Sequence, residues 1–445
     1  MISRYFHSIE FHSDLCKSSM KCMRICPTHA IRIKNNEILF LEERCIDCGE
    51  CIKICPHGAI TPKTDSFDTF SNYKYTVAIP SPTIFTQFGK EVTPKEVIYA
   101  LKRVGFDDVY HISWECEAIF RAIREHVNNH QGRYPLISSS CPVIIRLIQV
   151  NYPEMVDQII SLDVPKEIAA KKIKKEISEL YNIKPEEVGT IYITPCASKI
   201  ISIKQPAEKD KSNVDAAISI GSLYNDLYAE LAKMKKDKKN TQSEEDFKNS
   251  YYINQEIPFT KNSIYWAIVG GEGRVSGVKD WVNVAGLQNV INTFDDIEKG
   301  KIKNVKYVEC YSCQGGCVGG TLTVENVYIA RSTALYLLDI LPELSNAEKL
   351  KMMEIYKTGA FSPENKINPR FRTPTNIIDA IKKKKQKDDL IRRLPHVECG
   401  LCGAPTCNCF AEDVVNGLSN MEDCFLYAGD KLDNIIKRYK NDMKT

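Results

Sequence analysis

The segment Val308–Gly320, which reads VECYSCQGGCVGG, concentrates residue types that can bind a metal. Cys313 and Cys317 are four positions apart with two glycines between them, and two further glycines follow. Because glycine lacks a Cβ, this backbone can approach a large inorganic group closely. Two thiolates at this spacing suit iron or zinc better than a disulfide. The segment therefore predicts a redox or metal site.

Two isolated cysteines stand where short apolar runs end. Cys141 lies in SSSCP after the run Tyr134–Ile137, and Cys196 lies in TPCASK after the strand-like run Val188–Ile193. In α/β proteins the loops that follow strands are the ones that present ligand-binding residues. We therefore interpret both cysteines as part of ligand-binding loops.

Taken together, these three segments resemble, in the same order, the three signature loops of the [FeFe]-hydrogenases. The resemblance covers roughly residues 75 to 360. It implies that four cysteines hold a [4Fe-4S] cluster and that the last one bridges to a two-iron site carrying carbon monoxide, cyanide and a dithiolate. The metal ligands would be Cys141, Cys196, Cys313 and Cys317, with Cys317 as the bridge.

The resemblance also assigns residues around the two-iron site. Lys199 falls where the family uses a lysine to contact one cyanide, and Pro80 with Ser81 matches the pair that contacts the other. Glu309, four positions before the first cysteine of the third loop, also matches the family pattern. We therefore expect Pro80, Ser81 and Lys199 to bind the cofactor, and Ser81, Lys199 and Glu309 to take part in catalysis.

The chain departs from the family pattern along the proton path. Ser140 stands where productive members have a proton-relaying cysteine, and a hydroxyl is a poor relay at neutral pH because its pKa is far above that of a thiol. Tyr311 and Thr194 replace methionines, Ser202 replaces a glutamate, and the usual acidic pair has no evident counterpart in residues 120–126. We still place Ser140 at the catalytic position, and we expect slow turnover.

Residues 1–62 resemble a two-cluster ferredoxin, in which the fourth cysteine of each run binds the other cluster. The expected ligands of one cluster are Cys45, Cys48, Cys51 and Cys26. Those expected for the other are Cys16, Cys22 and Cys55, with Ser19 facing the fourth iron. Ser19 could bind through oxygen, or the cluster could be [3Fe-4S]; a zinc ribbon is the alternative to both, and the x2-x2-x3-Pro spacing argues against it.

A third cysteine group closes the chain. Its pattern is Cys399-x2-Cys402-x4-Cys407-x16-Cys424. This pattern resembles the small [4Fe-4S] domain of corrinoid iron–sulfur proteins and of certain electron-transport subunits, with a structural zinc site as the alternative. The remaining cysteines, Cys116, Cys310 and Cys409, are interpreted as ordinary thiols.

Length and composition fit this assignment. The chain has 445 residues, 18 cysteines and a formal net charge of +3, and this balance requires neither nucleic acid nor membrane as a partner. No apolar run approaches the roughly 20 residues that span a bilayer, and the first residues lack the apolar region of a signal peptide. We expect a cytoplasmic location, where so many cysteines favour metal clusters over disulfides.

The predicted fold class is α/β, because β-branched runs alternate with helical stretches from Lys74 onward. We expect a ferredoxin-like module over residues 1–62, a catalytic domain of parallel sheets flanked by helices over residues 75–370, and an α-rich iron–sulfur module over residues 374–445. Within the second, the pattern predicts a helix over Pro94–Val104 capped by Thr93, a strand over Val109–Ile112, and a helical stretch over Asn151–Tyr181 interrupted at Pro165.

Three further segments invite functional interpretations. Lys233–Asn249 is charged and is interpreted as a solvated insertion. Val269–Arg274 is rich in glycine but lacks the ending of a nucleotide-binding loop. The lysine run Lys382–Lys385 predicts an exposed helical face, with an electrostatic docking site as the minority interpretation.

The resemblance thus implies a ferredoxin-type [FeFe]-hydrogenase that interconverts H2 with protons and electrons, of the divergent, sensory branch. Its redox partner would be a ferredoxin or a signalling protein, and homodimer formation stays open. Two alternatives remain at this point: a non-catalytic iron–sulfur protein like the eukaryotic assembly factors, and a catalytic electron-transfer subunit of a larger complex.

Overall fold

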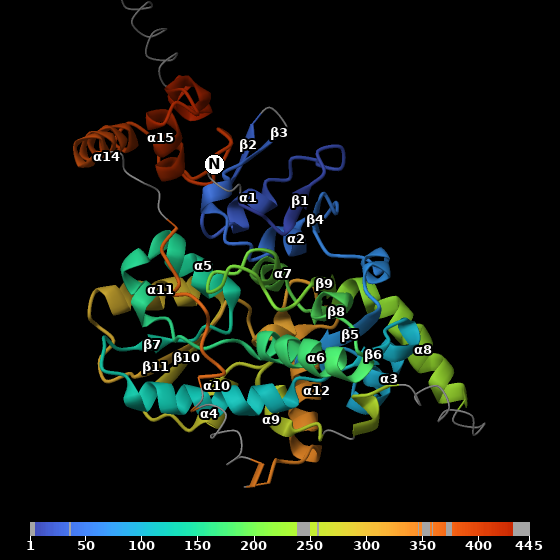
Figure 1. Cartoon of the computed structure of the whole chain (residues 1–445). Coiled ribbons are helices and arrows are strands. Elements are labelled where there is room, and N and C mark those ends of the chain that lie inside the picture. Colours follow the sequence, from blue (N-terminus) through green and yellow to red (C-terminus); the bar gives the residue numbers. More distant parts are fainter. Residues whose placement is uncertain are drawn as a thin grey trace, which may run out of the picture.

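The computed structural model describes residues 5–34, 37–237, 250–255, 258–345, 347–348, 357, 359–370 and 376–429. Figure 1 shows the N-terminal module above a central α/β domain, with the C-terminal module beside it. Residues 238–249 of the predicted insertion and residues 430–445 of the predicted third module lie outside the described residues. Lys233–Lys236, at the start of that insertion, belong to a helix.

The N-terminal module consists of two similar halves. Its strands form two antiparallel pairs, β1 (Ile9–Phe11) with β4 (Ile60–Pro62) and β2 (Ile31–Lys34) with β3 (Glu37–Phe40). Two short helices, α1 (Lys21–Ile25) and α2 (Glu50–Ile54), each lie within one cysteine run and contact each other. The arrangement follows the internal repeat of the sequence.

The larger sheet of the central domain is parallel. Its strand order is β6 (Asp108–Val109), β5 (Tyr75–Pro80), β8 (Val188–Thr194) and β9 (Ala216–Ser219). Alternate side chains enter two separate cores, since successive residues of a strand face opposite sides. The helices of one face are α4 (Ser113–Asn129), α6 (Pro165–Tyr181) and α7 (Ala197–Lys204), and those of the other are α3 (Pro94–Val104), α8 (Ile220–Asp237), α9 (Lys261–Tyr265) and α12 (Val327–Ile340).

The smaller sheet is parallel as well. Its order is β10 (Trp281–Ala285), β11 (Tyr307–Tyr311) and β7 (Leu136–Ile137). Helices α5 (Pro142–Asn151) and α11 (Leu287–Glu298) pack on one face, and α10 (Gly271–Ser276) contacts β10 and β11. The predicted parallel sheets flanked by helices are thus confirmed, and Figure 1 shows α6 in front of the larger sheet.

Local predictions succeed where a capping signal is present. Thr93 accepts a hydrogen bond from the backbone N–H of Glu96, and the Glu96 carboxylate accepts one from the backbone N–H of Thr93, so α3 begins as predicted. The predicted strand Val109–Ile112 is shorter, because only Asp108–Val109 pair with β5. The helical stretch predicted over Asn151–Tyr181 is wrong before Pro165, because α5 ends at Asn151 and α6 begins only at Pro165.

Two prolines explain that error. Pro153 starts a separate 3₁₀ turn, Pro153–Gln158, and Pro165 starts α6, with six non-helical residues between them. Proline favours the first turn of a helix, and it disfavours helical geometry in the residue before it. The interruption therefore separates two helical segments instead of bending one.

The C-terminal module, with helices α14 (Ile377–Ile391) and α15 (Cys407–Val415), packs against the N-terminal module. The buried Arg32 guanidinium donates two hydrogen bonds to the buried carboxylate of Asp413, at 2.5 and 3.0 Å. The backbone N–H of Ile33 donates to the carbonyl of Gly403, where a Cβ would lie 2.2 Å from the carbonyl oxygen of Ile33. A bidentate buried ion pair and close backbone contact fix this interface.

The N-terminal module also packs closely on the central domain. Cys48 belongs to the same apolar cluster as Val143 and Ile144 of α5. A Cβ at Gly49, whose φ is +78°, would lie 2.5 Å from Oγ1 of Thr321 in the third cysteine loop. This close approach brings one half of the ferredoxin-like module against the loops that carry the central cysteines.

Candidate metal centre and its pocket

The four central cysteines all follow the carboxyl ends of parallel strands. Cys141 follows β7 at the start of α5, and Cys196 follows β8 at the start of α7. Cys313 follows β11, and Cys317 begins the 3₁₀ turn Cys317–Gly319. Because carboxyl ends of parallel strands carry the loops of one edge, strands far apart in sequence can present these thiols together.

The thiols lie close enough to influence one another. The pKa of Cys196 is raised to about 12. Burial is the largest cause, Lys199 acts against it, and Cys317 and Cys141 act with it. Burial, then Cys196 and Cys141, raise the pKa of Cys313. Crowded thiols that are costly to ionise alone become favourable ligands once a cation takes their thiolates. This donor set fits an iron–sulfur cluster.

Glycines allow the third loop to reach the others. A Cβ at Gly316, with φ +91°, would lie 2.9 Å from the carbonyl oxygen of Ala267, and one at Gly320 would lie 2.4 Å from that of Pro195. Real Cβ atoms do not come this close to backbone, so larger residues would push the loop away. These two glycines allow backbone to approach backbone beside the cysteines, in addition to any approach to an inorganic group.

Lys199 lies directly beside the proposed bridging ligand. Its Nζ is 3.2 Å from Sγ of Cys317, and the residue is 5% exposed. Burial acts to lower the pKa of Lys199, but the charges of Cys317, Tyr192 and Cys196 raise it well above the ordinary value. The ammonium therefore stays charged beside the sulfur of Cys317, and it lowers the pKa of that thiol while burial, the larger cause, raises it.

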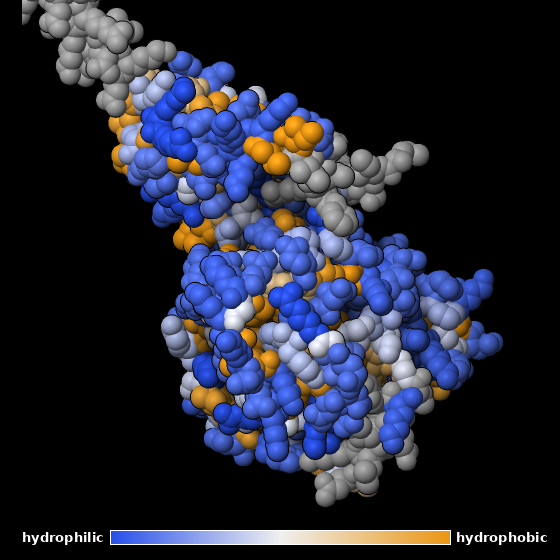
Figure 2. Space-filling view, turned by 90° about the vertical axis from the view of Figure 1, so that its left-hand side faces the viewer, coloured by the Kyte–Doolittle hydropathy of each residue, from blue (hydrophilic) through white to orange (hydrophobic). Residues whose placement is uncertain are grey.

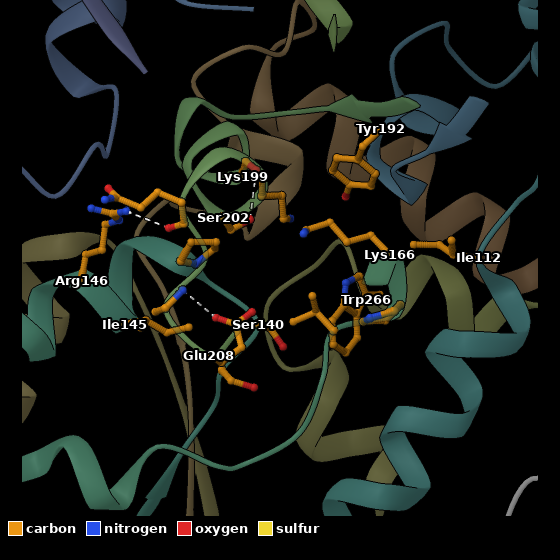
Figure 3. A pocket seen from close by; sticks show the side chains of 16 residues that line it. Ile112, Ser140, Ile145, Arg146, Lys166, Tyr192, Lys199, Ser202, Glu208 and Trp266 are labelled. Carbon is orange, nitrogen blue, oxygen red and sulfur yellow. Dashed lines mark hydrogen bonds between the residues drawn. The ribbon is translucent and has the colours of Figure 1, made fainter. Parts of the chain in front are cut away.

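A pocket adjoins this lysine (Figure 3). Ser140 and Ser202, which the resemblance places near the two-iron site, line this pocket. Tyr192 and Trp266 form part of its wall. The complete lining is Ile112, Ser139, Ser140, Pro142, Ile145, Arg146, Val164, Pro165, Lys166, Tyr192, Lys199, Ser202, Gln205, Ala207, Glu208 and Trp266. Cys317 itself is not among the lining residues, and Lys199, which contacts its sulfur, connects it with the pocket.

Pro80, Ser81 and Glu309, three further predicted site residues, are not among the residues that line this pocket. Pro80 ends β5, and Ser81 is buried, near enough to hydrogen-bond with Tyr192. The Glu309 carboxylate accepts hydrogen bonds from the backbone N–H groups of Gly270 and Gly273, at 2.9 and 3.0 Å. Glu309 thus holds the glycine-rich segment at α10 against β11, which indicates a positioning role.

The other predicted ligands fall into three separate cavities. One is lined by Cys26, Cys45, Cys48 and Cys51, a second by Cys16, Ser19, Cys22 and Cys55, and a third by Cys399, Cys402, Cys407 and Cys424. The fourth cysteine of each N-terminal run therefore lies with the other run. His57 also lines the cavity of Ser19, and a buried His7–Asp47 pair at 3.0 Å lies beside Cys45.

Sequence reasoning missed several buried charged residues near the site. Lys166, in the pocket, belongs to a lysine-rich helix that reads as exposed, so only its position after Pro165 hints at burial. Glu115 and Glu117 are fully buried on α4, ahead of the segment in which an acidic pair was sought. Burial raises the pKa of Glu115 to about 7, although Lys172 and Tyr110 lower it.

Glu272 is a further buried carboxylate. It accepts hydrogen bonds from the hydroxyls of Ser138, Tyr307 and Tyr311, at 2.7, 2.6 and 3.2 Å. Burial, and next the neighbouring Glu272, raise the pKa of Glu309. The hydroxyl of Tyr311, where the family has methionine, is thus used in this network.

Residues 74–321 match the family described as iron-only hydrogenase large subunit, C-terminal domain. The chain belongs to this family of iron-only hydrogenases. Residues 8–56 match the 4Fe-4S dicluster domain, and residues 394–425 match a family described as an Fe-S cluster. The hydrogenase family, the iron–sulfur character and the oxidoreductase class of the chain follow from these matches.

Two individual relatives are each less than 30% identical to this chain. Iron hydrogenase 1 of Clostridium pasteurianum is 28% identical over 271 residues, covering 52% of this chain and 46% of that protein. The NADP-reducing hydrogenase subunit HndD of Solidesulfovibrio fructosivorans is 24% identical over 157 residues, covering 33% of this chain and 26% of the relative. The matched regions thus span less than half the length of these hydrogenases.

Among solved structures, a variant of apo [FeFe]-hydrogenase HydA1 from Chlamydomonas reinhardtii aligns with a TM-score of 0.47 and 16% identity. It covers 66% of this chain and 95% of its own. Within the described part of the present chain, none of the helices has the length and apolar character needed to cross a membrane.

Proposed function

We propose that the chain interconverts H2 with two protons and two electrons at the pocket beside Cys317, and that the electrons pass through its iron–sulfur clusters. The observation that carries the proposal is the 3.2 Å contact between Lys199 and Cys317 at the wall of a pocket that also contains Ser140. A cluster-binding thiol, a buried cation and a neighbouring pocket together suit an anionic metal group attached to that thiol.

When bound, a two-iron group would supply the open iron site and the amine at which H2 is split, which is cofactor chemistry. Cys317 would attach the group, with Cys141, Cys196 and Cys313 as the other cluster ligands. Lys199 would bind one anionic ligand, and Pro80 with Ser81, which lies near Tyr192, would bind another. Ser140 would lie at the position of proton exchange, where its hydroxyl transfers protons slowly.

The packing supports an electron path from this site. The cavity of Cys26, Cys45, Cys48 and Cys51 adjoins the central domain, because Cys48 packs with α5 and Cys141 lies at the edge of the same cluster. We propose three modules, residues 1–62, 75–370 and 374–445, with two clusters in the first, one at the central cysteines and one in the last. The cluster facing Ser19 would be serine-ligated or [3Fe-4S].

We further propose that turnover is slow and that the chain reports hydrogen level or redox state to a partner. The support is the series of hydroxyls at Ser140, Thr194 and Ser202 in place of the family's proton-relay and neighbouring groups. The partner would be a ferredoxin or a signalling protein, and the expected location is the cytoplasm.

Infrared spectroscopy tests the central proposal. The protein, with its cubane clusters reconstituted, is incubated with the synthetic two-iron complex and washed free of excess. We expect bands of carbon monoxide and cyanide that are retained by the protein and that change under H2. Retained bands that do not respond to H2, or no retained bands, would contradict the proposed catalysis.

A non-catalytic role is the second candidate, because residues of the chain also match the cytosolic Fe-S cluster assembly factor NAR1 of Yarrowia lipolytica. That match is 26% identical over 83 residues, covering 19% of this chain and 16% of that protein. Iron content decides between the two, since this candidate predicts iron in cubane stoichiometry only, even after incubation with the two-iron complex.

A further inference from the structure

The pocket contains a second buried lysine that no part of the proposed function uses. Lys166 is 4% exposed and lies in the first turn of α6. Figure 3 shows its side chain and that of Lys199 extending into the pocket, one from α6 and the other from α7. A cation in the first helical turn faces the positive end of the helix dipole, and burial adds a cost. Lys166 therefore occupies an unfavourable position for a lysine that serves only stability.

A chain of charged groups holds this ammonium. Its Nζ contacts the carboxylate of Glu167, which also accepts hydrogen bonds from Ser212 at 2.7 Å and from the backbone N–H of Asn213 at 2.8 Å. Nζ of Lys209 lies 3.6 Å from Glu167 and 2.9 Å from Asp163. These contacts fix the carboxylate of Glu167, which in turn holds the ammonium of Lys166.

Glu167 is a charged partner at neutral pH. Burial acts to raise its pKa, but Lys166 and Lys209 together with the hydrogen bonds lower it to about 2. Burial raises the pKa of Asp163, further along the chain of groups, to about 6, although Lys209 lowers it. The carboxylate next to Lys166 thus keeps its negative charge over the whole range in which the protein would work.

The contact with Glu167 uses one donor of the ammonium, which has three. Arg146 is the third cation of the lining. Its guanidinium donates a hydrogen bond to the carbonyl of Gln205 at 3.3 Å, and two groups that raise its pKa, Asp47 and Cys45, belong to the N-terminal module. Glu208 is the lining carboxylate. Lys166 and Lys199 are therefore the two ammonium groups that line the pocket.

We propose that Lys166 is a second binding residue for the anionic two-iron group, donating a hydrogen bond to one of its ligands, and that Glu167, Lys209 and Asp163 position it. This inference rests on the proposed function, because it requires the group to enter this pocket. A charge-assisted hydrogen bond in a site shielded from water would strengthen retention of the group and withdraw electron density from it.

The test compares Lys166→Met, Lys166→Arg and wild type, all with reconstituted cubane clusters. Uptake of the synthetic two-iron complex is measured against its concentration, and the cyanide and carbon monoxide bands are recorded. We expect Lys166→Met to weaken uptake about tenfold or more and to move the cyanide bands to lower wavenumber, because a charge-assisted hydrogen bond is lost. Lys166→Arg, which keeps the charge and the donors, should restore most of both.

Lys174→Met is the matched control. Lys174 lies on the same helix and pairs with a carboxylate, Asp215, at 2.7 Å, so its loss should leave uptake and bands unchanged. Should Lys166→Met fail to fold, the double variant Lys166→Met/Glu167→Gln removes the pair together and should show the same losses.

The outcomes separate this inference from the proposed function. Uptake and bands equal to wild type in Lys166→Met or in the double variant would overturn the binding role of Lys166 and leave the proposed function intact. A wild type that retains no carbon monoxide or cyanide bands would overturn both.

Discussion

Two sides of the pocket differ in this chain: a metal side, with the central cysteines and Lys199, and a proton side, with Ser140 and Ser202. On the metal side, four thiols follow parallel strands, Gly316 and Gly320 allow close contact, and Lys199 lies 3.2 Å from Cys317. On the proton side, Ser140 and Ser202 are hydroxyls that exchange protons poorly at neutral pH. A metal group needs ligands at fixed positions, whereas proton transfer needs pKa values near the working pH. Under the proposed function, the chain therefore has the ligands that binding requires and lacks the groups that fast proton transfer requires.

The ferredoxin-like module repeats the contrast. The cavity with four cysteines adjoins the central domain, and the one with Ser19 contains Cys16, Cys22 and Cys55. The cavity with four cysteines thus lies next to the central cysteines, where an electron would enter or leave the proposed catalytic site. The cavity with serine lies in the other half of the module, where a different potential could be tolerated.

The largest expected effect is on the metal side. Cys317→Ala should abolish attachment of the two-iron group, because the bridging thiolate would be lost. The measurement is the infrared spectrum after incubation with the two-iron complex, and all retained carbon monoxide and cyanide bands should disappear. Cys116→Ala, which removes a buried cysteine outside the ligand set, should keep them. Bands that persist in Cys317→Ala would show that Cys317 is not the attachment point.

The next effect concerns a group that titrates near neutral pH. Folded Glu115 has a pKa of about 7, raised from the ordinary 4.5, so the folded state holds this proton more tightly than the unfolded chain. The free energy of unfolding should therefore fall as pH rises from about 4.5 to 7, by up to about 3 kcal/mol.

Glu115→Gln should remove that part of the slope, as measured by anaerobic denaturant unfolding at a series of pH values. Glu179→Gln, which changes an exposed carboxylate on the neighbouring helix α6, should retain it. An unchanged slope in Glu115→Gln would mean that this carboxyl is already ionised well below pH 7.

A smaller effect is expected on the proton side. Ser140→Cys should raise hydrogen turnover, because a thiol, with a reference pKa near 8.5, exchanges protons within reach of neutral pH. The gain should be modest, since Ser202 still stands where the family has a glutamate. The measurement is the H2 oxidation rate against pH, with Ser140→Ala as the control. Equal rates for wild type and Ser140→Cys at every pH would place the bottleneck further out or in electron transfer.

The smallest effect concerns the ferredoxin-like module. Ser19→Cys should complete the fourth ligand and either raise the iron content or change the spectrum of one cluster. Electron paramagnetic resonance and iron analysis would detect this, with Ser18→Cys as the neighbouring control. If neither quantity changes, the cluster in this cavity does not use position 19.

The sequence by itself determined the family and the grouping of the cysteines. The resemblance of the N-terminal runs to a two-cluster ferredoxin predicted which of their cysteines would share a cavity, and the structure shows that grouping. The capped helix Pro94–Val104 was predictable because Thr93 and Glu96 form its N-terminal hydrogen bonds within one turn.

Only the tertiary structure decided what surrounds the pocket. Lys166 lies in the stretch PKEIAAKKIKKEIS, in which lysines usually face solvent, yet it is buried. Its partner Glu167 is held by Lys209, Ser212 and Asn213, more than forty positions away. Burial also made Glu115 titrate near neutral pH, and a close backbone approach explained Gly316 and Gly320. Charge energetics depend on the solvent and partners that folding provides, and residue order alone does not specify them.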